Sequence, residues 1–233
     1  RKKLEVVRFE FNLEDNIFKL HDDLLAGIYV PEKYVSFYVR DPKLRHIHKA
    51  SVRDRVFQQA LFSVLYEIFD KSFIFESYSS RKNKGTHSGN ERLENFLRKT
   101  TSNWTRGVYV LKCDVKKFFD FIDHEILFSL IKRKVMDERT LKLICTVLFG
   151  FEKTHGEGLP LGNVTSQLFA NVYMNEFDQF VKHKLKIKYY ARYCDDFVIV
   201  DRDIKLLKNY IPIIRQFLYN NLKLDLHPNK ISI

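Results

Sequence analysis

The sequence has few cysteines, no long apolar run and a deficit of acidic residues. Its three cysteines among 233 residues, Cys113, Cys145 and Cys194, are odd in number and far apart. This pattern predicts neither a disulfide framework nor a zinc site, and it favours a reducing compartment. No apolar run is long enough to span a membrane and the N-terminal residues lack an apolar signal core. We therefore expect a cytoplasmic protein that does not enter a bilayer.

Basic residues outnumber acidic ones by 40 to 29, which gives a formal net charge of +11 at pH 7. Nucleic acid is the leading candidate for a polyanionic partner, and a merely soluble basic surface is the alternative. With 45% hydrophobic and 15% aromatic residues, the chain can bury a core in one large domain or two subdomains. The sequence begins at Arg1 rather than at methionine, which suggests a piece excised from a longer protein.

The periodicity of apolar residues predicts a mixed α+β chain. Segments rich in β-formers predict strands at 34–39, 44–48, 108–113, 188–193, 197–200 and 222–226. Helical spacing predicts helices within 1–30 and at 52–69, 91–99, 123–134, 137–150, 165–178 and 203–219. Asp41-Pro42-Lys43 predicts the turn between the first two strands. A basic loop at 77–90 precedes a helix and could bind phosphate through Arg81, Lys82 and Lys84. A glycine-rich loop at 156–163 also precedes a helix, where free N–H groups can bind a ligand.

Two adjacent carboxylates, Asp195 and Asp196, lie at the tip of the hairpin predicted over 188–200. Like charges at close range disfavour each other's ionised form, and divalent cations would relieve that repulsion. The alternative is that aspartate is simply a favoured turn residue. A third carboxylate, Asp114, follows the strand at 108–113, so we prefer metal binding.

The order of these features resembles the palm of a reverse transcriptase. Residues 113–124, Cys-Asp-Val-Lys-Lys-Phe-Phe-Asp-Phe-Ile-Asp-His, look like the first catalytic motif of bacterial reverse transcriptases, and Tyr193-Cys194-Asp195-Asp196 matches their Tyr-x-Asp-Asp signature. The resemblance runs from about Tyr29 to Lys230. It implies an α+β right-hand polymerase fold whose antiparallel palm sheet is backed by helices.

The same resemblance implies a division of the chain. Fingers are expected at 1–107, with a part returning near 135–160, and the palm at 108–233. In the family a primer-grip hairpin and a helical thumb follow, so the chain is expected to contain fingers and palm, with the thumb absent.

The chemistry that the resemblance implies is RNA-templated addition of dNTPs to a primer 3′-hydroxyl. Two Mg²⁺ ions, for which Mn²⁺ is a substitute, stabilise the attacking and leaving oxygens in such a reaction. Asp114, Asp195 and Asp196 are then the catalytic residues and metal ligands, and the backbone carbonyl of Val115 completes the metal site. The implied partners are an RNA template and a DNA or RNA primer, with a small basic accessory protein as a further candidate.

The resemblance also assigns residues to the dNTP pocket. Phe119 matches the aromatic gate that favours deoxynucleotides, although a phenylalanine can equally be core. Arg81 resembles the arginine that grips the triphosphate, and Lys84 is a second candidate, whereas basic loop residues such as Lys82 are usually solvated. Strand alternation would put Lys112 on the face of Asp114, and we leave it unassigned.

The subgroup depends on Leu161, Gly162 and Gln167, which are expected at the pocket. The commonest family pattern has glutamine before Gly162 and proline after Ser166, where this chain has Leu161 and Gln167. A leucine can only pack, so a looser grip on the nucleotide follows as a hypothesis. This version resembles the error-prone enzymes of diversity-generating retroelements, which are bacterial or phage-encoded.

Several alternatives remain open at this point. A group II intron-like or defence-associated reverse transcriptase would carry the same aspartates. A non-catalytic nucleic-acid-binding fragment and a two-metal nuclease are the alternatives from other functional classes.

Overall fold

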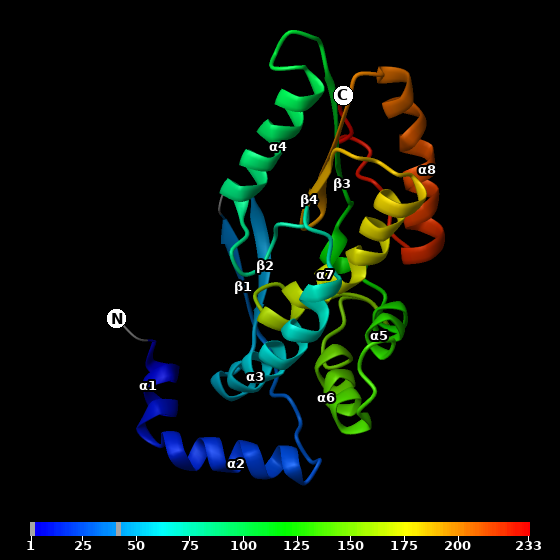
Figure 1. Cartoon of the computed structure of the whole chain (residues 1–233). Coiled ribbons are helices and arrows are strands. Elements are labelled where there is room, and N and C mark those ends of the chain that lie inside the picture. The colour runs from blue at the N-terminus through cyan, green and yellow to red at the C-terminus, as the bar shows by residue number, and fades with distance from the viewer. Residues whose placement is uncertain (1–2, 41–42) are drawn as a thin grey trace.

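The computed structural model describes residues 3–40 and 43–233 (Figure 1). The predicted turn at Asp41-Pro42 lies outside the described residues. The helices and strands are, in chain order, α1 Leu4–Phe11, α2 Leu13–Leu25, β1 Val35–Arg40, β2 Leu44–Lys49, α3 Val52–Phe69, α4 Thr86–Thr100, β3 Tyr109–Asp114, α5 His124–Lys132, α6 Glu138–Leu148, α7 Val164–Gln179, β4 Tyr190–Tyr193, β5 Asp196–Asp201 and α8 Ile204–Leu222.

The larger of the two sheets is three-stranded and antiparallel, with the strand order β3-β5-β4. Its side chains alternate between two faces, as in any β-strand. Leu111 and Cys113 of β3 join the main core, to which α7 and α8 contribute. Val110 and Val198 lie on the other face, where Phe96 of α4 completes a smaller cluster. The sheet is thus covered by α7 and α8 on one side and partly by α4 on the other (Figure 1).

A second, two-stranded sheet is formed by the β1-β2 hairpin, whose strands pair antiparallel from Val35 opposite Lys49 to Arg40 opposite Leu44. All residues of β1 are exposed. The hairpin is tied to the glycine-rich loop because the His48 N–H donates to the carbonyl of Leu161 at 3.1 Å. Helix α3 follows the hairpin and packs along α7. This contact connects the hairpin to the three-stranded sheet that α7 covers.

Side-chain caps fix where several helices begin. Ser51 accepts a hydrogen bond from the Asp54 N–H at the start of α3, and Asp123 accepts one from the Ile126 N–H at the start of α5. Asp203 caps α8 in the same way. Such caps satisfy backbone donors that have no partner within the helix.

Three expectations about the elements need correction. The predicted N-terminal helix is interrupted at Asn12, which separates α1 from α2. Helix α4 begins at Thr86, five residues before the predicted start at Glu91. Residues 222–226 do not form a strand: Leu222 is the last residue of α8, and Lys223 ends it in the left-handed region at φ 49°.

Within the described residues, none of the helices combines the length and the apolar character needed to cross a membrane.

Candidate active site

The pairing of β3 with β5 brings the three aspartates of the sequence motifs to one end of the central sheet. Asp114 is the last residue of β3 and lies opposite Asp196, the first residue of β5. The N–H of Val115 donates to the carbonyl of Asp195 at 3.2 Å. Cys194 turns the chain between β4 and β5 with a left-handed φ of 57°. Residues that are far apart in the sequence thus become neighbours through strand register.

The carboxylates affect one another electrostatically. Burial raises the pKa of Asp195 above its ordinary value, and the negative charges of Asp114 and Asp196 raise it further. A cation would relieve this crowding.

One cation already lies there, because the Lys230 ammonium contacts Asp114 Oδ2 at 2.5 Å. The hydrogen bond to Asp114 raises the pKa of Lys230, against a smaller opposing effect of burial. The sequence does not predict Lys230, because no local pattern marks it. Only the folded chain brings it next to Asp114 at the end of β3.

The donor set suits a hard divalent cation by its chemistry, since carboxylate and carbonyl oxygens are the ligands that Mg²⁺ prefers. Among the described residues, however, no three or more acidic, histidine or cysteine side chains are grouped so that they could hold a metal ion as they stand. Asp114 Oδ2 instead accepts a hydrogen bond from the Lys230 ammonium.

A cavity of about 560 Å³ lies next to the aspartates. It contains six of the predicted site residues, Phe119, Leu161, Gly162, Gln167, Asp195 and Asp196, together with Arg45, Ile47, Ser79, Ser80, Asn171, Tyr193 and Cys194. Phe119 is half-buried, while Gln167 is exposed on the first turn of α7. Val115 is buried beside Asp114 rather than in the cavity.

Arg81 and Lys84, which are predicted at the nucleotide pocket, do not line this cavity. The Arg81 side chain is only 7% exposed, and it donates to Asp70 Oδ1 at 2.7 Å and to the carbonyl of Ile74 at 2.6 Å. The Lys84 ammonium donates to the carbonyl of Phe75 and lies 3.4 Å from the centre of that ring. Both cations hold the loop together.

Arg45 is the cation that the sequence analysis missed. It is exposed on β2 and lines the cavity. Its only sequence signal is strand alternation with Ile47, which also lines the cavity, and that signal could not be recognised before the hairpin was placed against the glycine-rich loop.

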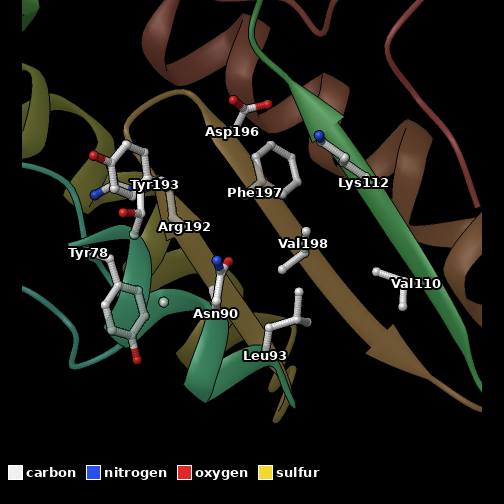
Figure 2. Close-up of a pocket in the computed structure, with 13 residues that line it drawn as sticks. Tyr78, Asn90, Leu93, Val110, Lys112, Arg192, Tyr193, Asp196, Phe197 and Val198 are labelled. Atoms are coloured by element: carbon white, nitrogen blue, oxygen red, sulfur yellow. The ribbon is translucent and has the colours of Figure 1, made fainter. Parts of the chain in front are cut away.

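A second hollow of about 410 Å³ lies between α4 and the sheet. Asn90 and Leu93 of α4 form one wall, and the sheet side chains of Val110, Lys112 and Val198 form the other (Figure 2). Tyr193 and Asp196 also line it. Because β3 stays regular up to Asp114, Lys112 lies on the same sheet face as Asp114 and its partner Asp196.

Solved structures of telomerase have a similar fold. Apo telomerase from Candida tropicalis superimposes with a TM-score of 0.60 over 92% of this chain and 48% of that chain, at 12% identity. Telomerase from Candida albicans, in complex with a fragment of telomeric RNA, gives a TM-score of 0.59 over 87% of this chain and 42% of that chain, at 10% identity. These likenesses define the fold as polymerase fingers and palm, as the sequence predicted.

The sequence pattern of the family described as reverse transcriptase (RNA-dependent DNA polymerase) matches residues 39–233, so the chain belongs to this family. Protein YkfC of Escherichia coli K12 is 27% identical over 92% of this chain and 66% of its own length. The group II intron-encoded protein LtrA of Lactococcus lactis is 28% identical over 76% of this chain and 30% of its own length. The chain thus spans just under two thirds of the first relative and less than a third of the second.

Proposed function

We propose that the chain carries the nucleotide-adding centre of an RNA-templated DNA polymerase. One observation carries the proposal: strand pairing puts Asp114 opposite Asp196 and beside Asp195, at the edge of a cavity of about 560 Å³, in a member of the reverse transcriptase family. The substrates would be dNTPs, an RNA template and a DNA or RNA primer. Residues 1–107 together with 135–160 would act as fingers and residues 108–233 as palm.

Asp114, Asp195 and Asp196, with the carbonyl of Val115, would hold two Mg²⁺ ions or their Mn²⁺ substitutes. Such ions supply Lewis-acid stabilisation of the attacking and leaving oxygens. One carboxylate oxygen of Asp114 accepts a hydrogen bond from the Lys230 ammonium. This hydrogen bond would break when Asp114 binds a metal ion.

The cavity residues would orient the nucleotide. Arg45 is the exposed cation at its rim and would contact the triphosphate, where a planar guanidinium can form two charge-assisted hydrogen bonds. The half-buried ring of Phe119 would exclude a ribose 2′-hydroxyl. Leu161 and Gly162 would pack against the base pair.

A purified-chain primer-extension assay with a primed RNA template, dNTPs and Mg²⁺ tests the proposal. We expect Asp195→Asn with Asp196→Asn to abolish extension while circular dichroism and thermal unfolding stay unchanged. Asp201→Asn, at the far end of β5, is the matched control and should retain activity. Extension by the double variant would refute the metal assignment.

The subgroup is a finer proposal. Leu161 and Gln167 both line the cavity, which supports the altered nucleotide grip of a diversity-generating retroelement enzyme. The similarity to LtrA supports the group II intron-like alternative. In either case the protein would act in the cytoplasm of a bacterium, and a small basic accessory protein remains a prediction.

A second candidate function is nucleic-acid binding without synthesis. It is supported by the Lys230–Asp114 ion pair, in which a protein cation already neutralises one of the carboxylates. This candidate predicts RNA binding together with no extension by the unmodified chain.

A further inference from the structure

A fully buried ion pair joins the β4-β5 hairpin, which carries Asp195 and Asp196, to α7. The side chains of Arg192 and Asp178 are both 0% exposed. Arg192 Nε donates to Asp178 Oδ1 at 2.8 Å and Nη2 donates to Oδ2 at 2.7 Å, a two-pronged contact between β4 and α7. The hydroxyl of Tyr190 also donates to Asp178 Oδ1, at 2.6 Å.

The remaining guanidinium donors reach the hairpin turn and two other segments. Nη1 donates to the carbonyl of Cys194 at 2.8 Å and to Asn171 Oδ1 at 3.3 Å, and Nη2 donates to Ser77 Oγ at 3.0 Å. Each of the three guanidinium nitrogens is therefore used.

The contact with Cys194 has a direct geometric consequence. Cys194 has the left-handed φ of 57° that closes the turn, and its carbonyl belongs to the peptide bond that leads into Asp195. A non-glycine residue in this region carries a conformational cost, so it persists where surrounding contacts determine it. The guanidinium of Arg192 supplies such a contact through its hydrogen bond to the Cys194 carbonyl.

The backbone of Arg192 joins the same place to the cavity wall. Its N–H donates to the carbonyl of Glu76 at 2.9 Å, and its carbonyl accepts from the Tyr78 N–H at 3.0 Å. Asn171, a guanidinium partner, donates to the carbonyl of Ser79 at 2.9 Å, and both of these residues line the cavity. Arg192 thus connects the β4-β5 hairpin, α7 and residues 76–79 through both its side chain and its backbone.

Stability is a weak explanation for this arrangement. Removing two charges from water is costly, and replacing a buried ion pair by uncharged side chains of similar volume is often neutral or stabilising. An apolar pair could fill the same space, but it could not hold the Cys194 carbonyl. The hydrogen bonds of the guanidinium fix the orientation of the groups that they join, and an apolar pair would not.

We propose that Arg192 is a positioning residue, which fixes the Cys194 turn so that Asp195 and Asp196 keep their orientation toward Asp114 and the cavity. The catalytic consequence rests on the proposed polymerase function, whereas the structural consequence, a turn held by the guanidinium, does not.

The test separates positioning from stability by removing both charges together. Arg192→Met alone leaves the Asp178 carboxylate buried without a counter-charge, so we expect a large fall in the melting temperature. Arg192→Met with Asp178→Asn keeps an acceptor for Tyr190 and should recover most of that fall. Arg133→Met with Glu176→Gln removes an exposed ion pair that also involves α7, and it is the matched control.

In the charge-free double variant we expect faster hydrogen exchange at the amides of residues 194–196. Mn²⁺ affinity, measured by electron paramagnetic resonance, should fall about 10-fold to 100-fold, the range for residues that orient metal ligands. The kcat of primer extension should fall about 100-fold, as for a small misplacement of catalytic groups, with RNA affinity unchanged.

Wild-type exchange at residues 194–196 in a double variant with recovered melting temperature would overturn the proposal. If that variant does not fold, Arg192→Lys provides the same test, because an ammonium can keep the charge near Asp178 without the planar contact to Cys194. Hydrogen exchange needs no activity. A chain that neither binds Mn²⁺ nor extends primers would refute the proposed function while leaving this readout valid.

Discussion

Arg45 and Arg81 have the same side-chain chemistry but lie in different surroundings. Arg45 is exposed at the cavity, whereas Arg81 is enclosed by Asp70 and backbone carbonyls. We expect Arg45→Ala to raise the KM for dNTPs by roughly tenfold or more, because a charge-assisted hydrogen bond contributes about 1.5–3 kcal/mol. Arg81→Ala should instead lower the free energy of unfolding by a similar amount, about 1.5–3 kcal/mol.

Steady-state kinetics and urea unfolding measure the two effects. Arg40→Ala, on the opposite face of the same hairpin by strand alternation, is the control and should change neither quantity. A well-folded Arg81→Ala variant with a raised KM would restore the original expectation for the basic loop.

Leu161 tests the link between the cavity and fidelity. It is half-buried at the cavity and its carbonyl is bonded to the hairpin, so its side chain can pack against a nucleotide but cannot donate a hydrogen bond to it. Leu161→Gln adds an amide at this position. We expect lower misincorporation opposite template adenine, measured by sequencing the cDNA, whereas Leu161→Met should keep the original error rate. Equal error rates in all three proteins would remove the proposed link.

At the scale of elements, Gly162 controls how closely the β1-β2 hairpin approaches the glycine-rich loop. Its φ is +113°, a conformation that L side chains rarely adopt, and an added Cβ would lie 3.2 Å from Ile47 Cγ2. We expect Gly162→Ala to destabilise the fold by about 1–3 kcal/mol, the usual cost of such a backbone conformation. The displaced hairpin should also raise the KM for dNTPs through Arg45.

Gly156→Ala is the control for backbone strain alone, since its φ is +74° but an added Cβ would meet no atom within 4 Å. Thermal unfolding and dNTP kinetics of both variants separate strain from the contact with Ile47. A Gly162→Ala enzyme with an unchanged KM would show that the hairpin does not transmit the change.

The elements were predictable where local signals were strong. Helix α3 has the predicted bounds, because its apolar spacing begins directly after a capping serine, and the β4-β5 hairpin is marked by its two apolar segments. The strand predicted at 222–226 failed for a physical reason. Leu222, Leu224 and Leu226 alternate as in a strand, yet the first belongs to the last turn of α8 and all three are buried by the core around it.

The same distinction applies to the site. The aspartates and Phe119 follow motifs of fixed spacing, so the sequence alone singles them out, and the structure places Asp195, Asp196 and Phe119 around one cavity. Arg45, Lys230 and Arg192 contribute through long-range contacts, so no short window of sequence identifies them. Lys230 contacts Asp114, which is more than a hundred residues away in the sequence. The side chain of Arg192 donates hydrogen bonds to partners on α7 and in residues 76–79.

At the scale of the whole molecule, the charge of +11 predicts that nucleic-acid binding is driven by phosphate contacts. We expect the RNA association constant to fall linearly with salt on logarithmic axes, with a slope of about −0.7 for each neutralised phosphate of a single strand. Lys112→Ala, on the sheet face that Asp114 and Asp196 share, should make the slope shallower by about 0.7. Lys19→Ala on α2 is the matched control and should leave it unchanged.

Fluorescence anisotropy with labelled RNA, measured over a series of salt concentrations, gives these slopes, and it also separates the two candidate functions. Asp195→Asn with Asp196→Asn removes negative charge from the site, so RNA binding should persist or tighten while primer extension is lost. Extension that depends on the aspartates supports a polymerase, because phosphate contacts alone need no carboxylate. Salt-dependent binding without extension by the unmodified chain supports a binding fragment, and binding that does not respond to salt would contradict the electrostatic argument for either function.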